Sequence, residues 1–204
     1  MATDDEFTFC PPAATEAGWL VLRRVQRADA ADLYDAVRAS IGHLKPWMPW
    51  ATDGYSREEA EDFTVRQTRA AEGEPVAEAP YVVRDRDGRF LGMCGLHARL
   101  GPGALEIGYW VDVRHARRGV TTLAAAALTE AGLAQPAVTS VEIRHDQANV
   151  ASGAIPAKLG YRHVQTRPDT PESPGDIGIE WRWLLRREEF PASPAARLLA
   201  TARA

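Results

Sequence analysis

Basic residues and one glycine are concentrated in ten residues, HARRGVTTLA, at positions 115–124. A strand-like run precedes this segment, and an alanine-rich, helix-like run follows it. The first N–H groups of a helix have no partner within the helix, and the helix dipole adds positive charge there. Gly119 allows a ligand to approach the backbone closely, and Arg117 and Arg118 add charge. The segment therefore predicts a binding site for an anionic group such as a phosphate.

Two common phosphate-binding patterns do not describe this segment. The P-loop pattern requires a lysine after its second glycine, and no lysine follows Gly119. The dinucleotide-binding fingerprint requires three glycines, two of which are missing. A capped helix with solvated arginines is the alternative that these residues leave open.

The segments on either side alternate between strand-like and helix-like patterns. Apolar residues at helical spacing after Asp29, which we expect to cap the helix, predict a first helix. Ser56 and Glu59 match the capping box of a second helix, and Gly160 follows the end of the last one. We expect a mixed α/β (α+β) sheet of about seven strands with flanking helices. The expected strands cover residues 19–25, 81–84, 89–96, 104–113, 138–145, 161–166 and 177–185, and the expected helices residues 30–41, 56–71, 121–134 and 149–159.

The composition indicates one compact domain. The chain has 204 residues, 45% of them hydrophobic and 25% charged, and its net charge is -4. A nucleic-acid-binding protein carries a basic excess, so the net charge argues against that class. We expect an irregular arm at residues 1–17, the domain at residues 18–186 and a partly disordered tail at residues 187–204.

Cysteine and histidine spacing and the N-terminal sequence indicate a cytoplasmic protein without a metal. Cys10 and Cys94 form no metal-ligand spacing, and we expect two buried free thiols. No apolar run is long enough to span a membrane, and the acidic N-terminus does not match a signal peptide. The five histidines show no zinc-binding spacing; they are His43, His97, His115, His145 and His163.

The order of several short motifs resembles the GNAT family, the Gcn5-related N-acetyltransferases, in its RimJ/RimL-like branch. The motifs are HLKPWMPWA, EIGYWV, the basic glycine turn, NVAS and KLGY, and they extend over residues 19–185. The resemblance implies a GNAT fold in which two splayed strands hold acetyl-CoA, without a metal. It also implies the transfer of an acetyl group to a primary amine by direct attack in a ternary complex.

The family's pyrophosphate turn, Q/R-x-x-G-x-G/A, falls on residues 116–121 and keeps Gly119. Ala116 and Thr121 depart from the family pattern at its first and last positions, and Arg117 and Arg118 can supply the missing charge. In the family, the strand before the turn pairs with the pantetheine arm of the cofactor. The resemblance therefore implies that the cofactor is bound by Trp110, Val111, Asp112, Val113, Arg117, Arg118, Gly119, Val120, Thr121, Thr122, Asn149 and Ser152.

The resemblance also suggests catalytic residues. Glu106 matches a glutamate that acts through water as general base in many members, although it could be an exposed strand residue. The family's usual tyrosine is replaced by Pro156, and Ser152 matches the serine that can donate to the leaving thiolate in the RimJ/RimL branch. Both Asn149 and Ser152 could instead cap a helix. We place Pro156 in the first turns of that helix.

The segment HLKPWMPWA resembles one wall of the acceptor site. We expect His43, Trp47, Trp50 and Tyr109 to bind the acceptor, because tryptophan faces attract a cationic amine. Nearby acidic residues, Asp53 and Glu58, are sparse for a polycationic antibiotic. A peptide or protein N-terminal amine and a small amine-bearing metabolite both fit. An antibiotic-modifying enzyme and a CoA-binding module without turnover are the alternatives, and the resemblance implies a monomer or a homodimer.

Overall fold

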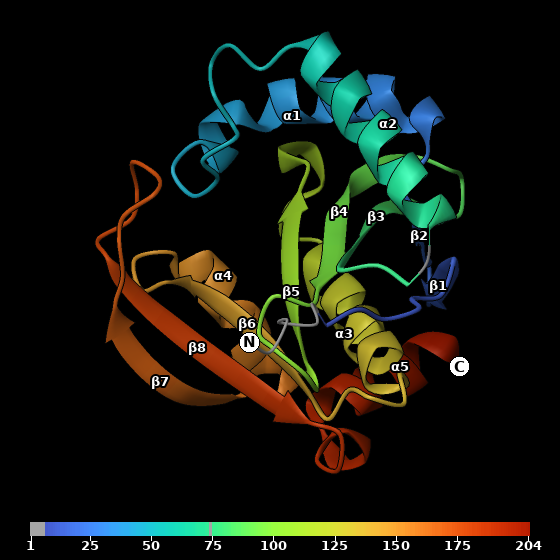
Figure 1. The fold of residues 1–204 in the computed structure, drawn as a ribbon, viewed down its shortest axis with the longest axis vertical. Coiled ribbons are helices and arrows are strands. Elements are labelled where there is room, and N and C mark those ends of the chain that lie inside the picture. Colours follow the sequence, from blue (N-terminus) through green and yellow to red (C-terminus); the bar gives the residue numbers. More distant parts are fainter. Residues whose placement is uncertain (1–6, 74) are drawn as a thin grey trace, which may run out of the picture.

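A single mixed sheet forms the centre of the molecule (Figure 1). The computed structural model describes residues 7–73 and 75–204. Eight strands are ordered β1-β2-β3-β4-β5-β6-β8-β7. The strands are β1 (Ala14–Ala17), β2 (Leu20–Arg24), β3 (Glu78–Asp85), β4 (Phe90–His97), β5 (Ala104–Val111), β6 (Ser140–Asp146), β7 (Arg162–Pro168) and β8 (Ile179–Arg186).

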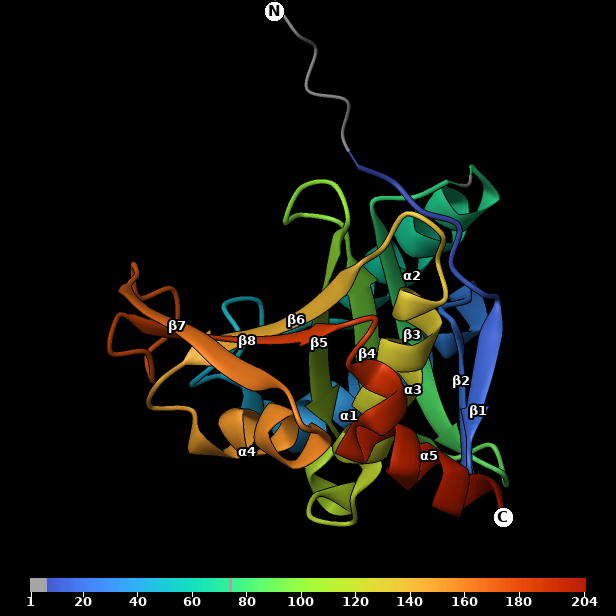
Figure 2. The ribbon, with the colours of Figure 1, turned by 90° about the horizontal axis from the view of Figure 1, so that it is seen from below.

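Helices cover both faces of the sheet. On one side α1 and α2 pack against β3 and β4, and on the other side α3 and α5 close the main core (Figures 1 and 2). The alanine-rich face of α3 is fully buried against the sheet, because small side chains allow the helix to approach the strands closely. The helices are α1 (Ala30–Leu44), α2 (Arg57–Glu72), α3 (Val120–Leu133), α4 (Val150–Leu159) and α5 (Pro194–Arg203).

The two central strands β5 and β6 separate halfway along their length. They run parallel and pair only where residues 104–106 meet residues 140–142. Beyond this point β5 continues beside β4, whereas β6 continues beside β8 (Figure 1). The fold is therefore the mixed sheet with a splayed strand pair that the sequence resemblance implies.

Local signals at helix ends have mixed outcomes. The capping box of α2 is confirmed, because the Glu59 N–H donates to Ser56 Oγ at 3.2 Å and the Ser56 N–H donates to Glu59 Oε2 at 2.7 Å. Gly160 ends α4 with a left-handed φ of 81°. Asp29 stands at the expected N-cap position of α1, but its buried carboxylate makes no cap bond to this helix and accepts hydrogen bonds from Arg23, Arg84 and the Gln26 N–H instead.

Both chain ends are more ordered than the sequence suggests. The expected irregular arm contains β1, a strand beyond the seven expected, which pairs with β2. The first six residues of the arm lie outside the described residues. The expected disordered tail contains α5, whose buried Ala195 and Leu199 join the main core. Ser193 caps this helix by accepting the Ala196 N–H at 3.1 Å, with Pro194 in the first turn.

The environments of the two cysteines differ. Both are free, but Cys10 is exposed, so the expectation of two buried thiols is wrong for this residue. Cys94 is fully buried in the main core, and burial raises the pKa of its thiol. None of the helices in the described part of the chain is both long and apolar enough to cross a membrane.

Candidate active site

Backbone groups of β5 line the gap left by β6. The Asp112 N–H donates to the Leu91 carbonyl at 2.9 Å, which ties this residue to β4. Because hydrogen-bonding directions alternate along a strand, Trp110 also faces β4, whereas Tyr109 and Val111 face the gap. The Val113 N–H donates to Ser40 Oγ of α1 at 2.9 Å. Of the expected stretch 110–113, only the Val111 amide is therefore directed into the gap.

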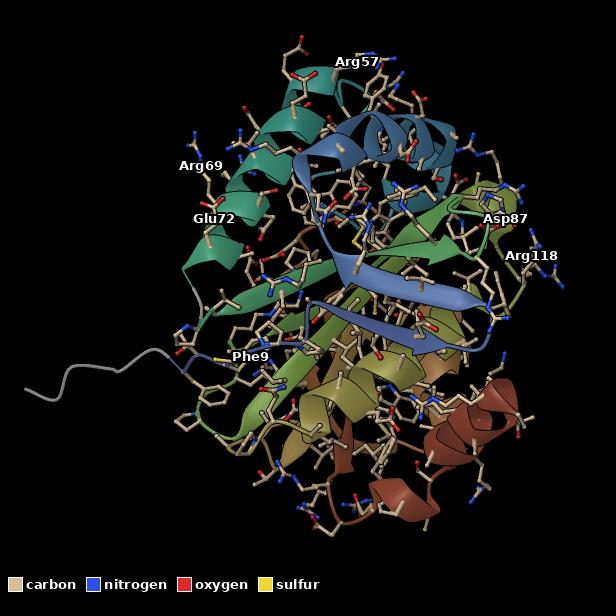
Figure 3. All side chains as sticks on the ribbon, turned by 90° about the vertical axis from the view of Figure 1, so that its right-hand side faces the viewer. Phe9, Arg57, Arg69, Glu72, Asp87 and Arg118 are labelled. Atoms are coloured by element: carbon tan, nitrogen blue, oxygen red, sulfur yellow. The ribbon has the colours of Figure 1, made fainter. Side chains whose placement is uncertain are left out.

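The basic glycine turn leads directly from β5 into α3. Gly119 has a left-handed φ of 78°, and a Cβ atom at this position would meet no atom of the described residues within 4 Å. Arg117 also has a positive φ of 62°, which costs a non-glycine residue about 1 kcal/mol. Arg118 projects from the surface (Figure 3), with Nη1 3.3 Å from His115 Nδ1. Two residues with positive φ, separated by Arg118, therefore shape the turn before α3.

The first turn of α3 presents its amide groups to open space. Its first N–H groups belong to Val120, Thr121 and Thr122 and have no partner within the helix. Within the described residues, no side chain caps this end of α3. The helix dipole, these amides and the nearby arginines can together bind an anionic group such as a pyrophosphate.

A small cavity of about 120 Å³ joins the turn to α4. It brings together Thr121 of α3, Asn149 and Ser152 at the start of α4, and Val111 of β5. His43 and Trp47 line the same cavity. These two residues were expected beside the acceptor, but the structure places them next to the residues expected to bind the cofactor.

Ser152 and Tyr109 are linked by two hydrogen bonds. Tyr109 Oη donates to the Ser152 carbonyl at 3.0 Å, and Ser152 Oγ donates to Tyr109 Oη at 3.3 Å. In a regular helix that carbonyl would accept the N–H of residue 156, which is missing because Pro156 stands there. Pro156 is the seventh residue of α4, which places it in the second turn, inside the helix. The tyrosine hydroxyl replaces the missing helix donor.

Asn149 and the Ser152 amide form the cap of α4. Asn149 Oδ1 accepts the Ser152 N–H at 3.1 Å, so the capping role that we left open for Asn149 is present. This bond leaves the Asn149 amide NH₂ and the Ser152 hydroxyl directed elsewhere, and both residues line the small cavity. Capping and ligand binding are therefore compatible at this helix start.

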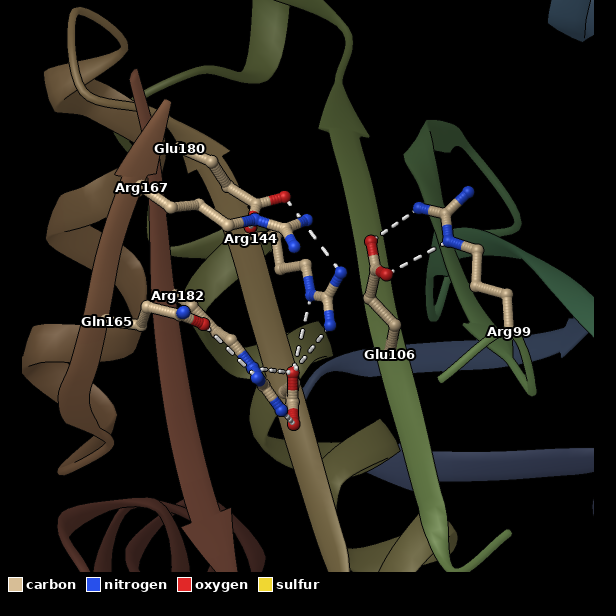
Figure 4. A network of polar contacts seen from close by, with 8 residues as sticks. Arg99, Glu106, Arg144, Gln165, Arg167, Glu180 and Arg182 are labelled. Carbon is tan, nitrogen blue, oxygen red and sulfur yellow. Dashed lines mark hydrogen bonds and ion pairs between the residues drawn. The ribbon is translucent and has the colours of Figure 1, made fainter. Parts of the chain in front are cut away.

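Glu106 is buried and paired with a cation. It is only 5% exposed, and Arg99 donates to both of its oxygens, with Nε 2.9 Å from Oε2 (Figure 4). An exposed strand residue, the alternative left open for Glu106, is therefore excluded. Arg99 therefore holds both carboxylate oxygens of Glu106 in a bidentate, charge-assisted contact.

Charged residues continue across the sheet beside Glu106. Glu142 of β6, which is 2% exposed, pairs with Glu106 in the strand register. Arg182 Nε donates to Glu142 at 2.5 Å and Arg144 Nη2 at 3.2 Å. Arg144 lies between this group and Glu180, to which Arg167 donates at 2.7 Å (Figure 4). On the face of β6 and β8 next to Glu106, the carboxylates are therefore neutralised by neighbouring arginines.

A larger cavity of about 710 Å³ lies between the sheet and α1 and α2. Trp50, one of the residues expected to bind the acceptor, lines it, and its ring centroid is 6.1 Å from that of Trp110. Met48, Tyr109 and Trp110 line both cavities, so the two spaces meet at this wall. A ligand in each cavity would bring its reactive end to the same part of β5.

The walls of the larger cavity are more acidic than the sequence suggests. Asp53 forms an ion pair with Lys45, and Glu58 is exposed on α2. The expectation of a sparse acidic lining was based on these two residues, and neither is among the lining residues of the cavity. Four other carboxylates line it beside the cations of Arg66 and Arg99, and they belong to Glu59, Asp62, Glu78 and Glu172.

His97 was noted only as a scattered histidine, yet it lies in this cavity. Its Nδ1 is 3.7 Å from Oε2 of Glu78, and Gln67 Nε2 donates to Oε1 of the same carboxylate at 2.5 Å. These contacts lower the pKa of Glu78 from 4.5 to about 2, with the His97 contact the largest cause. The signal in the sequence is the pair of glycines, Gly95 and Gly108, over which the imidazole packs.

Two loops meet beside the small cavity. The Gly175 N–H, between β7 and β8, donates to the Pro46 carbonyl after α1 at 2.8 Å. A Cβ atom on Gly175 would lie 2.6 Å from that carbonyl oxygen and 3.0 Å from the Trp47 ring. Only glycine permits this close approach, which holds Trp47 beside the small cavity.

Comparisons with known proteins agree with this geometry. Mycobacterium smegmatis RimJ in complex with CoA-disulfide is 25% identical, with a TM-score of 0.76 over 100% of this chain and 98% of that one. RimL, the ribosomal L7/L12 α-N-protein acetyltransferase in complex with coenzyme A, is 18% identical, with a TM-score of 0.74 over 86% and 96%. The ribosomal-protein-S5-alanine acetyltransferase from Vibrio fischeri is 15% identical, with a TM-score of 0.72 over 88% and 99%.

No curated protein sequence matches the chain. Among the residues that the structure describes, no group of three or more potential ligands could hold a metal ion. The family profile of the acetyltransferase (GNAT) domain matches residues 20–162, well over half of the chain. The chain therefore belongs to the GNAT family of acetyltransferases, in its RimJ/RimL-like branch.

Proposed function

We propose that the protein transfers an acetyl group from acetyl-CoA to a primary amine. The observation that carries this proposal is the gap between β5 and β6, which opens beyond Glu106 and leaves the Tyr109 and Val111 amides without a strand partner. An extended pantetheine arm can pair with such a strand edge. The unpaired amides of α3 and the basic turn fit the pyrophosphate. Bound there, acetyl-CoA supplies an activated thioester.

In this proposal the two cavities separate the two substrates. The small cavity holds the thioester end of the cofactor beside Ser152, whose hydroxyl can turn from Tyr109 Oη to donate to the sulfur. Asn149 offers its amide NH₂ to the pantetheine arm. The acceptor amine enters the larger cavity and reaches the shared wall at Tyr109 and Trp110. Direct attack in a ternary complex follows from this arrangement, because both ligands can be present together.

Glu106 has a structural role in the proposal. Its ion pair with Arg99 lies on the face of the sheet that carries His97, and the bidentate geometry holds both side chains in place. We do not propose Glu106 as the group that accepts the proton of the amine, since Arg99 occupies both of its oxygens.

The acceptor is either a peptide or protein N-terminal amine or a small amine-bearing metabolite. RimL and the Vibrio fischeri enzyme are described as acting on ribosomal proteins, which supports the first class. The acidic walls of the larger cavity support a small cationic acceptor, and they also make an aminoglycoside-type antibiotic a serious alternative.

Two measurements test the proposal. Calorimetric titration with acetyl-CoA is expected to saturate, and Gly119→Trp is expected to abolish binding because its side chain fills the space above the turn. Gly88→Trp is the matched control: Gly88 also has a positive φ and open space around it, but it lies in the turn between β3 and β4. Equal losses in both variants would contradict the assignment of the turn.

Turnover is measured by thiol release and by mass spectrometry in one reaction. The reaction mixes short peptides with free N-termini, a metabolite library and aminoglycosides. Acetylation of one class identifies the acceptor. Saturable acetyl-CoA binding without acetylation of any amine would instead indicate a CoA-binding module.

A further inference from the structure

A row of charged and titratable side chains crosses the sheet at the level where β5 and β6 separate. Glu78 of β3 pairs in register with His97 of β4, and His97 pairs with Glu106 of β5. Directly opposed residues project from the same face of a sheet. Glu106 is held by Arg99, and Glu78 by Gln67, so His97 is the ring at the centre of the row.

The surroundings of His97 orient its ring. The imidazole packs over two residues without side chains: a Cβ atom on Gly95 would lie 3.0 Å from Nε2, and one on Gly108 would lie 3.4 Å from it. Nδ1 faces the Glu78 carboxylate at 3.7 Å. This carboxylate favours the tautomer with the proton on Nδ1, which leaves a lone pair on Nε2. The side chain is 24% exposed and lines the larger cavity.

We infer that His97 is the general base that removes a proton from the acceptor ammonium, with Glu78 as its positioning residue. This inference rests on the proposed acetyl transfer. A proton passes from the ammonium to Nε2 of His97, and the freed lone pair of the amine attacks the thioester carbonyl carbon. As the C–N bond forms and the C–S bond breaks, the nitrogen releases its second proton, and the sulfur leaves with the electron pair and takes up that proton. His97 then returns its proton to water.

Two features distinguish His97 from the other candidates. Glu106, which lies opposite His97 on β5, has both oxygens bound by Arg99, whereas Nε2 of His97 carries a lone pair in the favoured tautomer. Histidine is also the side chain that most often serves as a general acid or base. The charged groups that line the same cavity are Glu78 of β3, Arg99 after β4, Glu59, Asp62 and Arg66 of α2, and Glu172 of the loop before β8, and Glu106 lies beside them on the same face of the sheet.

The test is the pH dependence of kcat/KM for an acceptor amine. In the wild-type enzyme we expect kcat/KM to rise along a limb with increasing pH, because only neutral imidazole accepts a proton. His97→Gln is expected to lower kcat/KM about 100-fold and to lose this limb, while the affinity for CoA stays within about twofold. His163→Gln is the matched control, because His163 packs against Trp181 and Trp183 outside both cavities.

A second pair of variants separates chemistry from structure. His97→Ala leaves space above the two glycines, and added imidazole is expected to restore part of the rate, which a purely structural role would not allow. Glu78→Gln is expected to lower kcat about tenfold with little change in KM. Its side chain is half exposed, so this variant is expected to fold even if changes at His97 disturb the sheet.

The possible failures can be told apart. If the wild-type enzyme acetylates an amine but His97→Gln keeps the wild-type limb and rate, the role of His97 is wrong and the proposed function stands. If His97→Ala gains nothing from imidazole and Glu78→Gln is fully active, the role is equally contradicted. If the wild-type enzyme acetylates no amine, the proposed function falls and the role of His97 falls with it.

Discussion

The hydrogen bond between Tyr109 and α4 provides a quantitative test of the structure. Tyr109 Oη donates to the Ser152 carbonyl, which has no helix donor because residue 156 is proline. Burial raises the pKa of Tyr109, so the hydroxyl stays protonated and available as a donor. Tyr109→Phe keeps the ring but leaves this carbonyl unsatisfied, at a cost of about 1–3 kcal/mol in the free energy of unfolding.

Pro156→Ala is the second perturbation. Alanine at position 156 restores the backbone N–H that a helix directs at the Ser152 carbonyl. In that background Tyr109→Phe removes only the acceptor of Ser152 Oγ, and its cost should fall by about 1 kcal/mol. The effect of the proline on helix stability cancels, because it enters both sides of the double-mutant cycle.

The assay is urea-induced unfolding of the four proteins, followed by circular dichroism. Equal m-values would show that the compactness of the unfolded state has not changed. The expected result is an interaction energy of about 1 kcal/mol between the two substitutions. Additive effects, within about 0.5 kcal/mol, would refute the view that the tyrosine replaces the missing helix donor.

Three further predictions concern the loops, the buried ion pair and pH. Gly175→Ala should push the loops apart at Pro46 and weaken CoA binding about fivefold, as measured by calorimetry. Gly42→Ala is the control, because its Cβ would meet no described atom within 4 Å. This variant should leave CoA binding unchanged and stabilise α1 by about 1 kcal/mol. Arg99→Met should destabilise the fold by about 2 kcal/mol in urea unfolding, because buried Glu106 loses its partner. Adding Glu106→Gln should recover part of this loss. Fully additive effects of the two substitutions would contradict an ion pair that contributes to stability. The folded-state pKa of Glu78 is depressed, so its contribution to stability is present above pH 4.5 and is lost as pH falls towards about 2. Because the side chain is half exposed, this contribution is about 1 kcal/mol or less, and thermal unfolding of Glu78→Gln between these pH values should show a smaller decline than the wild type; parallel declines would contradict the assignment.

Local sequence determined the elements whose stability depends on neighbouring residues. The capping box of α2 and the glycine at the end of α4 act within a few residues, so the printed sequence is sufficient to predict them. The order of the motifs from residue 19 to residue 185 was likewise sufficient for the family and for the splayed strand pair. The strand β1 and the helix α5 were missed, because each is ordered by packing against distant parts of the chain.

The chemical groups of the site were decided by the tertiary structure. Whether Glu106 is a free base or half of an ion pair depends on Arg99 reaching it from the turn after β4. The opposition of Glu78 and His97 depends on strand register, and a shift of one residue would turn either side chain to the other face of the sheet. The sequence by itself determined which residue types were present and the turn that precedes α3. Only the long-range pairing of strands decided which of those side chains meet, because register is set by contacts that no local pattern encodes.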